Sequence, residues 1–61
     1  MDKLIIEVES PLKGKRVSLF QTDKYYKITT QDQVNNDLQN VCFINNIEAL
    51  TKFNEKMTEV L

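Results

Sequence analysis

The last third of the chain constrains the fold most, because a short apolar strand there leads directly into an amphipathic helix. Residues 41–44 are apolar on both alternating sides, which is typical of a short buried strand. Asn45 follows, three residues before Glu48, a spacing typical of a helix cap. Apolar residues then recur every three to four positions, so we expect a helix from Ile47 to Val60 that packs on a sheet. The expected apolar stripe consists of Ile47, Leu50, Phe53, Met57 and Val60 or Leu61.

Three further strands are expected in the first half of the chain. Residues 3–10 alternate in polarity and end at Pro11, which cannot donate a hydrogen bond to a sheet. Residues 16–21 and 25–30 alternate again around a short polar connection, and Gly14 suits a left-handed turn before them. The sequence therefore predicts an α+β fold, with a four-stranded, mostly antiparallel sheet and one C-terminal helix packed on one face (ββββα). The face toward the helix is expected to hold Leu4, Ile6, Val8, Val17, Leu19, Tyr26 and Ile28.

Residues 31–40 give the weakest structural signal, because only Val34 and Leu38 are apolar among these ten positions. Thr30 is placed to cap a short helical turn with those two side chains on one side. A polar loop fits the same residues equally well, so both alternatives stay open. Loops of this length often carry function.

The length of the chain limits how much apolar surface it can bury. Sixty-one residues predict a single small domain, residues 1–61, and a chain of this size buries only about 60% of its unfolded surface. Such domains usually gain further stability from disulfides, metals or oligomerisation. One cysteine and no histidine exclude an internal disulfide and argue against a zinc site, so we expect no metal and no cofactor. Self-association, or docking on another protein, is therefore the remaining source of additional stability.

The N-terminal sequence predicts neither a signal peptide nor a membrane span. Its apolar run, Leu4-Ile5-Ile6, is too short for either. We therefore expect a cytoplasmic protein that makes no contact with a membrane. Cys42 fits this location as a reduced thiol buried in the core.

One helix can cover only one face of a four-stranded sheet, so the second face needs another cover. That face is expected to carry Ile5, Phe20 and Tyr25, together with either Cys42 and Ile44 or Val41 and Phe43. Exposed apolar patches on small proteins usually mark interfaces. We therefore expect a homodimer, or a small adaptor or inhibitor of a larger protein, of phage or bacterial origin. The expected partner-binding residues are Ile5, Phe20, Tyr25 and Ile44.

The sequence contains no recognisable catalytic set, and we expect a protein that is not an enzyme. There is no histidine for acid–base chemistry near neutral pH, and the serines and Cys42 have no adjacent base. Glu7 and Glu9 lie on one side of a strand, where acidic pairs usually form a solvated edge. A single glycine cannot build a phosphate-binding loop.

Single-stranded nucleic acid is the alternative partner. Residues 1–30 hold six basic and four acidic side chains, whereas residues 31–61 hold two and five, so the halves carry +2 and −3. Cations that follow phosphates and aromatic rings that stack on bases are the requirements for such binding, and Phe20 and Tyr25 supply rings near the lysines. The residues expected to contact nucleic acid are Lys13, Lys15, Arg16, Lys24 and Lys27.

Four strands followed by a helix, with a Lys13-Gly14-Lys15 turn, resemble the transcriptional-coactivator family of dimeric single-stranded-DNA binders related to the whirly proteins. The resemblance implies a dimer in which residues 41–61 supply a strand and a helix that pairs across the two copies. The net charge of −1 departs from that family.

Overall fold

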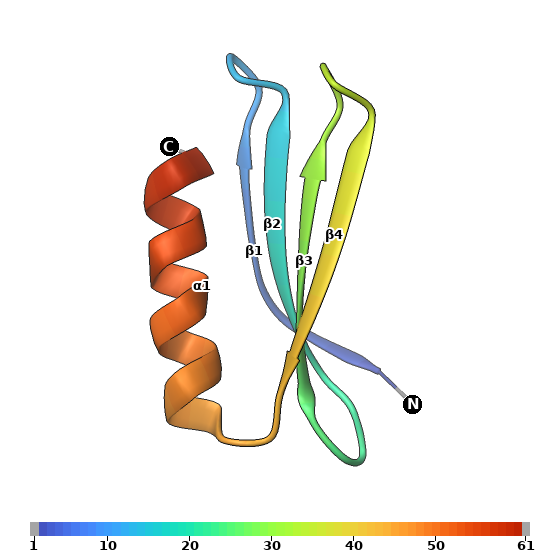
Figure 1. Cartoon of the computed structure of the whole chain (residues 1–61), viewed down its shortest axis with the longest axis vertical. Helices are drawn as coiled ribbons and strands as arrows, with labels where there is room; N and C mark the ends of the chain where they lie inside the picture. Colours follow the sequence, from blue (N-terminus) through green and yellow to red (C-terminus); the bar gives the residue numbers. More distant parts are fainter. Residues whose placement is uncertain (1, 61) are drawn as a thin grey trace.

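Four strands form one antiparallel sheet in chain order, and a C-terminal helix lies against one of its faces (Figure 1). The structure, a computed structural model, describes residues 2–60. Neighbouring strands pair antiparallel throughout. The predicted α+β fold of order ββββα is therefore confirmed. The elements are β1 (Lys3–Ser10), β2 (Lys15–Gln21), β3 (Tyr26–Asp32), β4 (Asp37–Phe43) and α1 (Asn46–Val60).

The core lies between α1 and the two central strands. The helix packs mainly on β2 and β3, and β1 and β4 form the edges of the sheet. Val8, Tyr26, Phe43 and Met57 are partly buried around this centre. Among the described residues, the fully buried hydrophobic side chains are Val17, Leu19, Ile28, Ala49, Phe53 and Val60.

The helix begins within one residue of the predicted start and buries Phe53 and Val60 of the expected stripe, but its first turns bury a different residue. The side-chain Oδ1 of Asn45 accepts hydrogen bonds from the backbone N–H of Ile47 at 2.7 Å and of Glu48 at 3.4 Å, which caps the first turn. Ala49 is buried in that turn, whereas Ile47 and Leu50, both expected in the stripe, are exposed. The small side chain of Ala49 faces the sheet, so the larger residues beside it lie at the flank. Leu61, the last member of the expected stripe, lies outside the described residues.

A register shift in β1 places Leu4 on the opposite face from the one predicted. Leu4 pairs with Phe20 and Ile6 pairs with Leu19, so one residue, Ile5, is left over between them. Residues directly opposite each other in paired strands point to the same side of a sheet. Leu4 therefore lies with Phe20 on the outer face of the sheet, which is the face opposite α1. Ile6 lies with Leu19 on the face that α1 covers. Alternation alone could not indicate this bulge.

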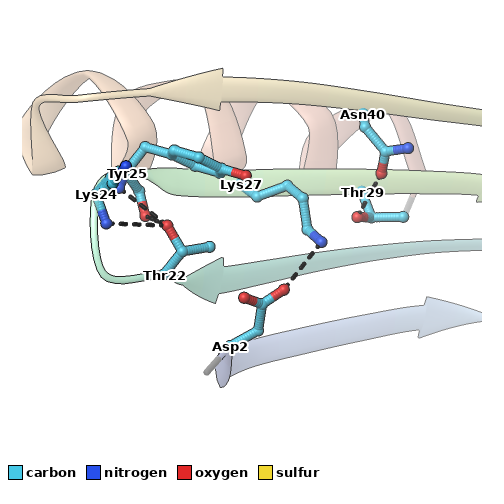
Figure 2. Close-up of polar contacts among 7 residues, drawn as sticks. All are labelled: Asp2, Thr22, Lys24, Tyr25, Lys27, Thr29 and Asn40. Atoms are coloured by element: carbon cyan, nitrogen blue, oxygen red, sulfur yellow. Dashed lines mark hydrogen bonds and ion pairs between the residues drawn. The ribbon is translucent and has the colours of Figure 1, made fainter.

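Residues 31–40 form a β-hairpin, so both the loop and the helical turn predicted there are wrong. Asp32 pairs with Asp37, and residues 33–36 connect β3 to β4. Asn36 adopts a positive φ of 55°, which asparagine tolerates better than most residues. The hydroxyl of Thr29 donates a hydrogen bond of 2.8 Å to Oδ1 of Asn40 across the two strands (Figure 2). An edge strand with one solvated face needs few apolar residues, which explains the weak signal.

The β1–β2 and β3–β4 hairpins have their tips at the same end of the sheet (Figure 1). These two tips contact each other. The carbonyl of Gly14, between β1 and β2, accepts a 2.8 Å hydrogen bond from the backbone N–H of Gln33, between β3 and β4. Gly14 has a φ of +64°, as predicted, and a Cβ at this position would lie 2.7 Å from Cγ2 of Val34. Both backbone conformation and close packing therefore favour glycine here.

Candidate interaction surface

The face of the sheet opposite α1 is mostly polar, so it is not the broad apolar surface that the sequence predicts. Apolar side chains on it lie mainly near the start of β1, around Phe20. Apart from Leu38, the centre and the far end hold hydroxyl, amide and charged groups. From that start to the far end, the cross-strand rows of the outer face are Leu4–Phe20–Lys27–Cys42, Glu7–Ser18–Thr29–Asn40 and Glu9–Arg16–Gln31–Leu38.

The ring of Phe20 is shielded by a neighbouring cation. The ammonium Nζ of Lys27 lies 5.2 Å from the ring centroid, within the range of a cation–π interaction. The same ammonium forms an ion pair of 3.2 Å with Oδ2 of Asp2 (Figure 2). Phe20 therefore presents less open apolar surface than expected, and the charge of Lys27 is already balanced.

Arg16 is likewise balanced within the chain. Its Nη2 donates a hydrogen bond of 3.3 Å to Oε2 of Glu9. Its Nε lies 3.2 Å from Oε1 of Glu7, a distance typical of an ion pair, although this buried nitrogen does not reach hydrogen-bond geometry. Two carboxylates thus share one guanidinium, which leaves this part of the outer face with net negative charge.

The four predicted partner-binding residues do not share one strand face. Ile5 lies at the bulge of β1, and Phe20 lies on the outer face of β2. Tyr25 lies in the connection before β3, where its backbone N–H donates a 3.0 Å hydrogen bond to Oγ1 of Thr22 (Figure 2). Ile44 is 87% exposed in the connection between β4 and α1. All four are at least partly accessible, but two of them lie in connections.

Cys42 is exposed, so the expectation that it packs in the core is wrong. It follows Val41 in β4 and lies opposite Lys27 on the outer face. Because α1 covers only the other face and β4 is an edge strand, nothing in the sheet buries this thiol.

The free edge of β1 carries the longest run of exposed apolar residues in the sheet. Leu4, Ile5 and Ile6 are consecutive and are 47%, 42% and 39% exposed. This run has apolar side chains on both faces, because Leu4 points outward and Ile6 points toward the helix side. Strands that are apolar on both faces are usually interior strands of a sheet. Regular alternation placed Leu4 and Ile6 in the core and only Ile5 on the outer face, so it did not predict that all three residues are exposed.

The exposed side chain of Leu50 lies on the flank of α1 that faces β1. The opposite flank, with Lys56 and Glu59, lines a hollow together with Asp37 of β4. Residues on opposite flanks of a helix face opposite edges of the sheet below it. Leu50, 44% exposed, therefore lies on the flank of α1 that is turned away from that hollow and toward the β1 side of the sheet.

The basic residues of the nucleic-acid alternative are divided between the two ends of the sheet. Lys13, Lys15 and Arg16 lie at or next to the β1–β2 connection, whereas Lys24 and Lys27 lie at or near the β2–β3 connection at the opposite end (Figure 1). The hollow beside Lys15 is also lined by acidic side chains of β3, β4 and α1. The structure therefore brings these five cations into two groups, each with acidic neighbours.

No protein-family model, curated protein or solved structure matches the chain. The resemblance to the coactivator family therefore rests on the order of the elements and on the Lys13-Gly14-Lys15 turn. No helix among residues 2–60 is long and apolar enough to cross a membrane. Within the same residues, no three histidine, cysteine, aspartate or glutamate side chains are grouped as metal ligands would be.

Proposed function

We propose that this chain is a non-catalytic interaction protein that binds another polypeptide, either a second copy or a larger protein, in the cytoplasm. The observation that supports the proposal is the exposed run Leu4-Ile5-Ile6 on the free edge of β1. An edge strand offers unpaired backbone N–H and C=O groups, and a neighbouring strand from another chain would bind there. The apolar side chains would add burial on both faces of the sheet.

The binding surface proposed here differs from the outer sheet face expected from the sequence. Phe20 is shielded by Lys27, and the remaining outer face is largely polar. Edge strands normally carry charges or other features that discourage pairing. No charged residue lies from Leu4 to Ile6, and the bulge at Ile5 is the one protective feature there, so the edge is a better candidate than the face.

Nucleic acid is the weaker candidate, because Arg16 and Lys27 already pair with carboxylates. Binding of single strands requires cations that are free to neutralise phosphates. A gel-shift titration with a labelled single-stranded oligonucleotide at about 50 mM salt separates the two functions. A shift that disappears as salt rises would favour nucleic acid over the interaction proposed here.

The proposal is tested by measuring the mass of complexes formed by the wild-type chain and by Ile5→Lys. The purified chain is analysed by light scattering, and a tagged chain is used to recover partners from cells that produce it. We expect an assembly, with itself or with another protein, that is lost in Ile5→Lys. The matched control is Leu38→Lys, which adds the same charge at an exposed position on the other edge. Assemblies that are identical in all three chains would contradict the proposal.

A further inference from the structure

We propose that the partner at the β1 edge is a second copy of this chain, paired antiparallel about a two-fold axis to form one continuous eight-stranded sheet. This inference rests on the proposed function and names the partner of the same surface. The strand order across the dimer would be β4-β3-β2-β1-β1-β2-β3-β4. Two-fold dimers are the commonest oligomers, and their interfaces use the same patch on both copies.

The composition of the two edge strands distinguishes the edge that pairs from the edge that does not. β1 holds three consecutive apolar residues, which would become buried in the centre of an eight-stranded sheet. β4 ends in three apolar residues as well, but its first half holds Asp37, Gln39 and Asn40 around Leu38, which suit a solvated edge. Pairing through β1 therefore covers the more exposed apolar run and leaves the more polar of the two edges in water.

The charges along β1 favour a second copy in antiparallel orientation. Lys3 lies at the start of the strand and makes no ion pair within residues 2–60. Glu7 and Glu9 lie toward the end of the strand and share the single cation Arg16. Antiparallel pairing places the basic start of each β1 next to the acidic end of the other, with Lys3 on the helix side of the sheet and the glutamates on the outer face. Parallel pairing would place like charges together.

The same charges restrict the position of the two-fold axis. An axis between Ile5 and Ile6 places Lys3 opposite Val8 and Leu4 opposite Glu7 of the other strand, so opposed residues share a face and the glutamates of the two strands stay apart. An axis near Val8 would place Glu7 opposite Glu9 of the second copy, which is repulsive. The bulge at Ile5 shortens the regular part of the strand, so we expect a dimer that dissociates on dilution.

The flank of α1 adds apolar surface on one side of this pairing. Leu50 lies on the helix side of the sheet, on the flank toward β1, and Ile6 points to the same side. Each copy would contribute both side chains to the dimer, because the two helices lie on the same face of a continuous sheet. Leu50→Glu should therefore weaken the dimer while the helix itself still forms.

The first experiment is sedimentation equilibrium over a range of protein concentrations. We expect a reversible dimer whose dissociation constant rises about tenfold or more in Ile5→Lys, since a central interface residue is replaced by a charge. Lys3→Glu should raise the dissociation constant roughly threefold or more. The control Lys24→Glu makes the same charge change in the β2–β3 connection and should leave the dissociation constant unchanged. Circular dichroism verifies that each variant remains folded.

The second experiment locates the contact directly by disulfide cross-linking. Single cysteines replace residues 3–8 one at a time in a Cys42→Ser background, and each chain is oxidised under mild conditions. Opposed residues of an antiparallel pair have Cα atoms about 4.5–5.5 Å apart, close enough for a disulfide. We expect cross-linking to peak at Ile5→Cys or Ile6→Cys and to be absent in Leu38→Cys.

The outcomes separate this inference from the function on which it rests. A purified chain that stays monomeric at high concentration overturns the second-copy inference. If that monomer still binds a different protein through β1, the proposed function survives. A dimer that tolerates Ile5→Lys and cross-links through β4 or the outer face also overturns the inference.

Discussion

At the scale of single residues, several side chains hold the backbone where local propensity alone would not. Asn45 caps the helix, Thr22 closes the β2–β3 connection, and Asp32 closes the β3–β4 connection. Thr22 also donates its hydroxyl hydrogen to the carbonyl of Tyr25 at 2.9 Å (Figure 2). Each of these residues satisfies backbone groups that would otherwise need water.

Removing the helix cap should destabilise the protein. Asn45→Ala deletes the acceptor of the 2.7 Å bond from Ile47 N–H, and we expect a loss of about 1 kcal/mol in the free energy of unfolding. Asn54→Ala, on the exposed side of α1, is the matched control and should have no destabilising effect. Urea denaturation of the three chains measures the difference. Equal losses in the two variants would show that capping is not the cause.

The contact between Gly14 and Val34 predicts a non-additive pair of substitutions. Gly14→Ala should lower the free energy of unfolding by about 1–2 kcal/mol for the left-handed backbone, and further because its Cβ meets Val34. Val34→Ala alone should have little effect, because this side chain is largely exposed. The double variant should be more stable than additivity predicts, since the clash is absent. A double-mutant cycle in urea that closes additively would contradict the contact.

At the scale of elements, the β3–β4 hairpin and α1 are stabilised by different kinds of interaction, polar contacts in the hairpin and apolar burial in the helix. The hairpin depends on a polar turn and on the Thr29–Asn40 bond, whereas α1 depends on the burial of Phe53 between helix and sheet. The two elements should therefore respond to different perturbations.

The hairpin should be sensitive to acid through Asp32. Hydrogen bonds from the backbone N–H and then the side-chain amide of Asn35 lower the pKa of the Asp32 carboxyl below its ordinary value, helped by Lys15 and the N–H of Val34. The ionised form therefore stabilises the fold above the unfolded pKa of about 3.9, and this contribution is lost as the pH falls through the lower folded value.

A comparison with Asp32→Asn isolates this effect. The asparagine oxygen still accepts the turn hydrogen bonds but does not titrate. We expect the wild-type chain to be the more stable one at pH 7 and the difference to shrink below about pH 4. Thermal unfolding between pH 2.5 and pH 7 measures it. A difference that stays constant with pH would contradict the assigned cause.

The packing of α1 should depend strongly on Phe53. Phe53→Ala removes the largest helix side chain in the core, at a cost of about 3–5 kcal/mol. Small domains of this size rarely have more than that in total, so we expect loss of the cooperative unfolding transition. Phe53→Leu preserves much of the volume and should remain folded, which circular dichroism and urea titration can verify.

At the scale of the whole molecule, a small core is combined with an exposed apolar edge. Six hydrophobic side chains are fully buried among residues 2–60, and all of them come from β2, β3 and α1. β1 contributes exposed rather than buried apolar surface at Leu4, Ile5 and Ile6. A partner that covers β1 would therefore add to the stability of the fold.

Thermal stability should consequently depend on protein concentration. If two copies pair through β1, the midpoint of unfolding should rise by a few degrees for each tenfold increase in concentration, because association stabilises the folded state by mass action. The midpoint of Ile5→Lys should not change with concentration. Scanning calorimetry between about 10 µM and 1 mM tests this, and a constant midpoint for the wild-type chain would contradict the dimer.

The sequence by itself determined the order of the elements, the position of the helix and its cap, because periodicity and capping are local properties. It also determined that Gly14 occupies a left-handed turn, since the chain has no other glycine. It did not determine the pairing of residues 37–40, because an edge strand needs so few apolar residues that its pattern resembles a loop.

Only the tertiary structure decided which apolar residues are exposed. The bulge at Ile5 moved Leu4 to the outer face, and Ala49 rather than Leu50 faces the sheet. The ion pairs of Lys27 and Arg16 join residues that are far apart or on different strands, so charge counts could not predict them. Such features depend on register and on helix rotation, which are set by contacts between elements and not by the periodicity within any one of them.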